Sequence, residues 1–233
     1  MPRIFLSISL LAFVMLLANA AMGLRIGDFN GVARDHRRAQ AALRELERSG
    51  APRSEMQPYV DRAAAVADHL DEVKGRKMFH FLFGVAAVLV AVLVNCISIT
   101  YFIGTGRWCR EVCDAYRLDA DLVARANRIK RTTFPWALGG VLVLLSVVTT
   151  GAACDPSANL NSSADWVTVH LSVAMVGIVL VGWSFLTQWG RIASQQTLIG
   201  EIQQRVAEVR SAQGLDNPQA GDAAGGHESR VHD

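Results

Sequence analysis

The run MFHFLFGVAAVLVAVLVNCISITYFIG, residues 78–104, contains no lysine, arginine, aspartate or glutamate. As an α-helix it is long enough to cross a hydrocarbon layer about 30 Å thick. A charge inside that layer would be costly, so its absence from so long a run indicates a membrane-spanning helix. A β-strand is excluded because the run is too long and contains no proline or cluster of turn-forming residues that would divide it.

Three further runs are equally apolar and uncharged: Ile4–Leu24, Phe134–Ala153 and Trp166–Trp189. We therefore predict an all-α integral membrane protein, a four-span helical bundle with spans at residues 1–27, 78–104, 134–153 and 166–190. The first run also resembles a secretory signal with cleavage before Ala21. We favour retention, because the apolar run continues past that point to Leu24.

The distribution of positive charge predicts the topology. Residues 105–133 carry seven lysines and arginines, whereas residues 154–165 carry none. Basic loops stay in the cytoplasm, so the first segment is predicted inside, the second is an outer loop, and both termini are cytoplasmic. Arg76 and Lys77 lie on the predicted outer side and are a minor exception to the rule that basic residues stay in the cytoplasm. The expected location is the plasma (inner) membrane, with a multi-pass topology.

Residues 28–77 are predicted to form an antiparallel helical hairpin outside the membrane, continuous with the first two spans. Gly50 suits a helix end, Pro52 blocks continuation, and Ser54 is a plausible N-cap. Apolar residues recur at coiled-coil spacing in both halves. They are Val32, His36, Ala39, Leu43 and Leu46, then Met56, Tyr59, Ala63, Val66, Leu70 and Val73.

The remaining segments are predicted from their periodicity and composition. Residues 105–133 form a basic cytoplasmic helical loop, with Asp119 as an N-cap and Pro135 at the entry to the third span. Residues 191–213 keep a helical apolar stripe and form a cytoplasmic helix. Residues 214–233 are small and polar, which predicts a disordered tail.

Two histidines are the candidate site residues. His80 and His170 both lie near the predicted outer ends of spans that run in the same direction, so we expect them at similar depth. Each tops a stripe of small residues, which marks a helix-packing face. The stripes are Gly84, Ala87 and Ala91 below His80, and Ala174 and Gly177 below His170. The first two spans and the last two spans could be tandem copies of one hairpin, although the shared pattern is slight.

Two interpretations of this pair remain open. In one, His80 and His170 are axial ligands of haem b, held near the outer face of the bundle. In the other, they hydrogen-bond within or between helices, and the small residues are helix contacts. Cys109 and Cys113 share one helical face and could form half of a zinc site. Two ligands are missing, so we interpret them as reduced thiols and predict no metal site.

No catalytic motif is present: there is no phosphate-binding glycine loop, no H-E-x-x-H or G-x-S-x-G, and no carboxylate inside a span. We therefore expect a non-catalytic structural, assembly or sensing component that acts through helix–helix contacts and needs no cofactor. Its expected partners are anionic lipid headgroups at the cytoplasmic face and either a second copy or another membrane protein. Nucleic acid is not expected at a net charge of +2. The alternative is a b-type haem-binding electron-transfer subunit of the membrane.

Overall fold

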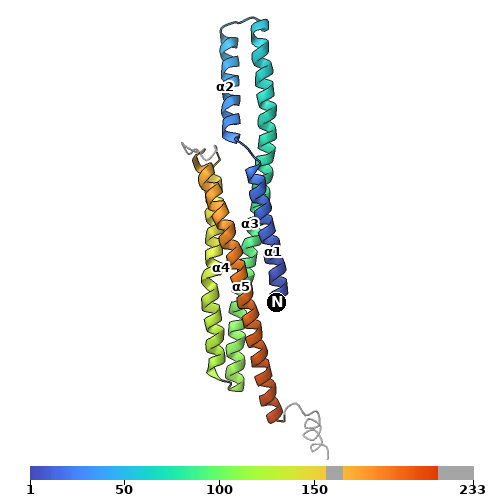
Figure 1. The fold of residues 1–233 in the computed structure, drawn as a ribbon, viewed down its shortest axis with the longest axis vertical. Coiled ribbons are helices and arrows are strands. Elements are labelled where there is room, and N and C mark those ends of the chain that lie inside the picture. Colours follow the sequence, from blue (N-terminus) through green and yellow to red (C-terminus); the bar gives the residue numbers. More distant parts are fainter. Residues whose placement is uncertain (156–164, 215–233) are drawn as a thin grey trace, which may run out of the picture. The chain divides into compact units, whose positions relative to one another are not determined.

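The computed structural model describes residues 1–155 and 165–214. Every regular element in these residues is an α-helix, and four helical stretches are long and apolar enough to cross a membrane. The helices, drawn in Figure 1, are α1 (Pro2–Leu24), α2 (Phe29–Arg48), α3 (Arg53–Tyr116), α4 (Ala120–Ala153) and α5 (Asp165–Ala212). The middle of the predicted outer loop and nearly all of the predicted disordered tail lie outside the described residues.

The chain divides into two compact units. Unit 1 comprises Met1–Leu6, Cys96–Leu138 and Phe185–Asp233, of which residues up to 214 are described. Unit 2 comprises Ser7–Asn95 and Gly139–Ser184. Helices α1, α3, α4 and α5 each contribute residues to both units, whereas α2 belongs wholly to unit 2. We describe the two units separately.

In unit 2, the chain bends sharply between α1 and α2. Gly27 adopts a left-handed φ of +78°, which favours glycine because it has no Cβ. Asp28 then caps α2, its carboxylate accepting a 2.8 Å hydrogen bond from the backbone N–H of Gly31. The prediction that the hairpin continues the first span without a break is therefore wrong. The other half is as predicted, because α3 runs unbroken from the hairpin into the second apolar run.

The hairpin turn matches the sequence prediction in part. Gly50 lies just after α2 with a φ of +69°, as expected of a residue that ends a helix. Ser54 is not an N-cap: α3 begins at Arg53, and the carbonyl of Pro52 accepts from the backbone N–H groups of the first turn. The helix therefore begins two positions earlier than a cap at Ser54 would allow, and the proline before it has a φ that is already helical.

The seam between α2 and the first part of α3 is thinly packed. The five seam residues predicted on α2 are half-buried, and α2 has no fully buried residue. On α3, Leu70 and Val73 are buried to 5% and 2% exposure, but Tyr59 remains 45% exposed, so its assignment to the seam is wrong. Burial is confined to the part of α3 nearest the apolar run, and the tip of the hairpin contributes little to it.

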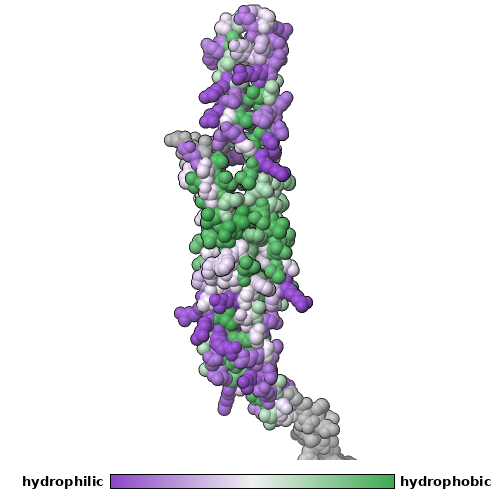
Figure 2. Space-filling view, viewed as in Figure 1, coloured by the Kyte–Doolittle hydropathy of each residue, from purple (hydrophilic) through white to green (hydrophobic). Residues whose placement is uncertain are grey.

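Beyond the hairpin, the surface of unit 2 changes from polar to apolar. Figure 2 shows hydrophilic side chains over α2 and the start of α3, and hydrophobic ones where α3 continues alongside α1 and α4. Phe79, Leu82 and Leu89 on α3 are each about 60% exposed. A soluble protein rarely exposes so continuous an apolar surface, whereas a helix in contact with lipid does.

Close approaches at glycines identify the neighbouring helices within unit 2. A Cβ atom added to any of these glycines would lie 3.1 Å or less from a side chain of another helix. Each helix of the four therefore packs against two others, as in a closed bundle. The pairs are Gly84 (α3) with Asn19 (α1), Gly177 (α5) with Val147 (α4), Gly182 (α5) with Phe13 (α1), and Gly140 (α4) with Asn95 (α3).

In unit 1, a tight turn joins α3 to α4. Arg117 ends the turn of α3 with a φ of +53°, and Asp119 accepts a 2.9 Å hydrogen bond from the backbone N–H of Asp121, so the predicted N-cap at Asp119 is confirmed. Pro135, predicted at the entry to the third span, lies inside α4 at the start of its uncharged apolar run. The amphipathic segment before it is already helical, and the missing N–H of the proline costs one backbone hydrogen bond without ending the helix.

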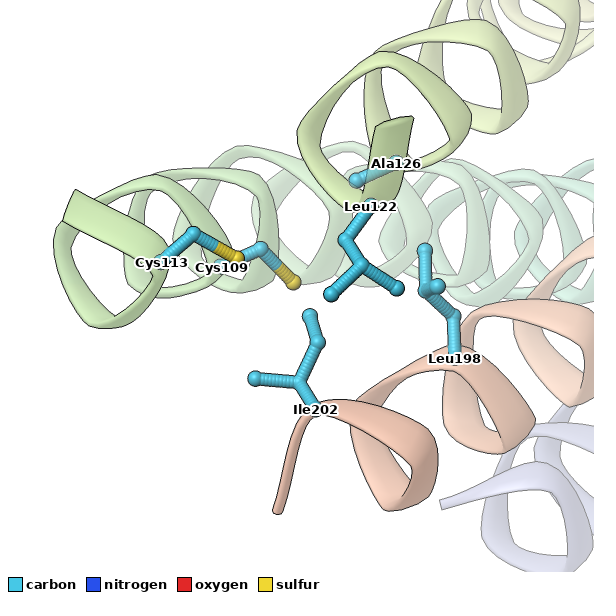
Figure 3. Packing of buried hydrophobic residues seen from close by; sticks show 6 residues of the cluster. All are labelled: Cys109, Cys113, Leu122, Ala126, Leu198 and Ile202. Carbon is cyan, nitrogen blue, oxygen red and sulfur yellow. The ribbon is translucent and has the colours of Figure 1, made fainter. Parts of the chain in front are cut away.

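The core of unit 1 is a small cluster contributed by three helices. Figure 3 shows side chains from α3, α4 and α5 converging on one point. The residues are Cys109, Cys113, Leu122, Ala126, Leu198 and Ile202, none more than 5% exposed. Beside it, the guanidinium of Arg125 on α4 makes two contacts of 2.9 and 3.1 Å with the carboxylate of Glu201 on α5. The helix predicted at residues 191–213 is thus a continuation of the fourth apolar run, within α5.

Candidate functional site

His80 lies at the contact between α3 and α1 in unit 2. Its Nδ1 atom is 3.1 Å from the backbone carbonyl oxygen of Asn19. The ring lies flat against Gly23, where an added Cβ would be 2.9 Å from Cε1 and 3.4–3.5 Å from both ring nitrogens. The absence of a side chain at Gly23 therefore makes the space that the imidazole occupies.

His170 has the same relationship to α4. Its Nδ1 atom is 3.2 Å from the hydroxyl oxygen of Thr150. A Cβ added to Gly151 would be 3.0 Å from Cε1 of His170 and 3.4–3.5 Å from the ring nitrogens. We call the space left by each glycine a notch. His80 of α3 fills the notch at Gly23 of α1, and His170 of α5 fills the notch at Gly151 of α4, so the two helix pairs α1–α3 and α4–α5 are matched.

The hydrogen bonds place Nδ1 of both rings against the protein. A backbone carbonyl only accepts, so Nδ1 of His80 donates to Asn19. The hydroxyl of Thr150 lies 2.9 Å from the carbonyl of Ser146, 3.1 Å from that of Val147 and 3.2 Å from Nδ1 of His170, so its single proton does not fix the donor of the last contact. Neither of the two histidine contacts involves Nε2.

The predicted small-residue stripes lie along these helix contacts. Ala87 and Ala91 have no exposed surface, and Gly84 lies under the amide of Asn19. In the other pair, Gly177 is buried against Val143 and Val147, with an added Cβ 3.2 and 3.0 Å from their methyl groups. Ala174 is half-buried. The structure thus uses the stripe residues for contact between helices.

The two helix pairs follow one burial pattern. When the sequences of α3 and α5 are aligned with His80 opposite His170 and no gap is introduced, buried residues of one helix stand opposite buried residues of the other. They are Ala87, Ala91, Val94, Ser98 and Phe102 on α3, and Gly177, Val181, Ser184, Gln188 and Ile192 on α5.

Aligning α1 with α4 so that Gly23 falls on Gly151 gives the same result. The buried residues are Phe5, Ser9, Ala12 and Leu16 on α1, and Thr133, Ala137, Gly140 and Leu144 on α4. The slight sequence resemblance between the helix pairs α1–α3 and α4–α5 therefore corresponds to a repeated pattern of buried positions. Sequence reasoning missed Gly23 and Gly151, because nothing local to a glycine shows which ring will lie against it.

Lys77, three residues before His80, forms an ion pair. The ammonium of Lys77 is 2.8 Å from the carboxylate of Asp155, just after α4, and 4.4 Å from the ring centroid of Phe29. This ion pair partly neutralises Lys77, one of the two basic residues on the predicted outer side.

The cysteine pair lies in the apolar cluster of unit 1. Burial raises the pKa of the Cys109 and Cys113 thiols, so both stay protonated at neutral pH and are poor metal ligands and nucleophiles. The side-chain amide of Gln195 donates to the sulfur of Cys109 at 3.6 Å. Among the described residues, no group of three or more His, Cys, Asp or Glu side chains is placed to hold a metal ion.

Comparisons with known proteins assign no relationship: no family model, curated protein or solved structure matches the chain.

Proposed function

We propose that the protein is a non-catalytic, four-span component of the plasma (inner) membrane that acts through helix–helix contacts in a structural, assembly or sensing role. The observation that carries this proposal is the pair of matched notches, in which His80 fills the space at Gly23 and His170 the space at Gly151. Inside a membrane, burial of apolar surface gives little association, so close packing and interhelical hydrogen bonds hold helices together. Each histidine supplies both.

The proposed orientation places both termini and the α3–α4 turn in the cytoplasm, with α2 outside. The charge distribution supports it, since the segment around the turn is basic and residues 154–165 carry no lysine or arginine. The ion pair between Lys77 and Asp155 supports it as well. A lysine neutralised by a carboxylate is a weaker exception to the rule that basic residues stay in the cytoplasm than a free lysine would be.

We assign the contact with a second copy, or with another membrane protein, to the outer hairpin. α2 is amphipathic, yet Val32, Leu43 and Leu46 on its apolar side are only half-buried. A two-helix hairpin is marginal by itself, and further burial of these side chains by a partner helix would stabilise it.

The test uses the full-length chain carrying either of two different tags, coexpressed and extracted in mild detergent. We expect the two forms to co-purify, and the variant Leu43→Lys/Leu46→Lys to reduce this at least several-fold. Arg37→Gln/Arg38→Gln, on the exposed side of α2, is the matched control. Equal helicity by circular dichroism excludes general unfolding. Co-purification that is unchanged in the lysine variant would remove the hairpin from the interface.

A b-type haem-binding subunit is the second candidate, favoured by one observation. In both histidines the hydrogen bond to the protein is made by Nδ1, which leaves Nε2 as the nitrogen that would ligate a metal, as in metal-bound imidazoles whose other nitrogen is held by the protein. Protein purified after expression with ample haem is examined by a dithionite-minus-oxidised spectrum. A b-type band that disappears in His80→Ala or His170→Ala would favour this candidate, and a colourless protein would eliminate it.

A further inference from the structure

A groove of about 600 Å³ runs between α3 and α4 in unit 1. Its lining residues are Ile103, Lys130, Arg131, Phe134, Pro135 and Leu138. The apolar part is open, with Ile103 at 55%, Leu138 at 52% and Phe134 at 38% exposure. The groove thus combines an exposed apolar wall with two cations.

The two cations lie at one end of the groove in chain order. The five lining residues on α4 stand at positions i, i+1, i+4, i+5 and i+8, which share one helical face, with the cations before the apolar residues. Lys130 reaches across to α3, since a Cβ added to Gly106 would be 3.9 Å from its Cδ and 4.0 Å from its Nζ. The ammonium is therefore held between the two helices.

Neither cation is neutralised within the described residues. The carboxylates on the neighbouring segments pair elsewhere, Glu111 with Arg107 and Glu201 with Arg125. No described carboxylate lies within 4 Å of Lys130 or Arg131. Two uncompensated positive charges beside an exposed apolar wall are complementary to an anion that also has an apolar part.

We propose that this groove binds one anionic phospholipid, with its phosphate between Lys130 and Arg131 and an acyl chain along Ile103, Phe134 and Leu138. The inference rests on the proposed orientation, which puts the cations at the cytoplasmic headgroup level. Basic pockets between spans on that side are suited to acidic headgroups, and each well-placed cation strengthens the attraction. Free inorganic phosphate would satisfy the cations but leave the apolar wall exposed.

The experiment reconstitutes the protein in phosphatidylcholine vesicles that contain a minority of phosphatidylglycerol. After extraction in mild detergent, the retained lipids are identified by mass spectrometry, and phosphatidylglycerol titrations give an apparent affinity. We expect phosphatidylglycerol to be enriched over its share in the vesicle, and excess inorganic phosphate to leave it bound. Lys130→Gln/Arg131→Gln should lower the apparent affinity roughly thirty-fold, as two cations predict.

Two further variants separate the headgroup from the chain. Arg110→Gln/Arg128→Gln removes the same charge from exposed positions outside the groove and should keep the enrichment. Ile103→Trp keeps both cations but fills the apolar wall, and should reduce the enrichment. Since Ile103 is 55% exposed, this change does not disturb the core.

Three results would overturn the proposal: no enrichment in the unsubstituted protein, equal losses in the groove and control variants, or displacement by inorganic phosphate. Co-purification of tagged copies is measured on the same protein, and surface labelling of Cys154 on the intact cells from which it is purified. If both are as proposed while lipid enrichment is absent, the groove assignment alone fails. If the labelling is reversed, the orientation fails instead.

Discussion

The imidazole of His80 lies so close to Gly23 that a Cβ atom at the glycine would be 2.9 Å from the ring. The same ring donates to the carbonyl of Asn19, one turn earlier on α1. The glycine and the hydrogen bond therefore constrain one another: the ring cannot retreat from a new methyl group without giving up its acceptor.

Gly23→Ala is expected to destabilise the protein by about 1–3 kcal/mol, the usual range for overpacking a tight contact. The measurement is the free energy of unfolding in mixed micelles. Gly139→Ala is the control, since no atom lies within 4 Å of a Cβ there, and it should not destabilise but gain up to about 1 kcal/mol from helix propensity. His80→Ala in the Gly23→Ala background should remove most of the penalty that the methyl group adds. Simple additivity of the two substitutions would contradict the contact.

The second notch should respond in the same way, with one difference. Gly151→Ala is expected to destabilise by a similar amount, because His170 lies against it at nearly the same distance. Here Nδ1 contacts a side-chain hydroxyl, so Thr150→Val removes that hydrogen bond while preserving shape, at a cost of about 0.6 kcal/mol, the average for such bonds in membranes. A stability loss in only one of the two notches would argue against the repeat.

Cys154 should be the thiol that labels from outside intact cells, with Cys109 and Cys113 protected, since these two are no more than 3% exposed. Burial raises the pKa of Cys154 and the ammonium of Lys77 lowers it. The thiolate is the reactive form, so the alkylation rate should still be rising with pH at the ordinary thiol pKa of about 8.5.

Lys77→Gln should raise the pKa of Cys154 further and slow its alkylation at a fixed pH of about 8. The rate of maleimide labelling, followed against pH, measures this. Lys74→Gln, one turn earlier on α3, is the matched control, because Lys74 pairs with Asp71 instead. Faster labelling in Lys77→Gln would show that the ion pair shields the thiol more than the charge activates it.

Leu198→Ala is expected to cost about 2–5 kcal/mol, because Leu198 is 1% exposed in the cluster that joins α3, α4 and α5. Leu138→Ala, at 52% exposure on α4, removes the same atoms from a surface position and should stay within about 0.5 kcal/mol. Thermal unfolding of the two variants in detergent compares them directly. Equal effects would mean that the cluster does not stabilise unit 1.

The helices were predictable because their signals are local. Absence of charge over a long run, the glycine at Gly50 and the carboxylate at Asp119 act on the backbone within a few residues. An error came where two local signals competed. Ser54 suggests a helix start, but the carbonyl of Pro52 already accepts from the first turn, and α3 begins at Arg53.

The sequence by itself determined how many helices are apolar enough to cross a membrane, and that two histidines top small-residue stripes. Both are properties of single helices, set by side-chain chemistry and helical spacing. Only the tertiary structure decided which residue each histidine meets. Whether Gly23 lies under His80, or Gly151 under His170, depends on the register between helices far apart in the chain, and on the summed packing of both. The repeat of burial between the two pairs became visible for the same reason.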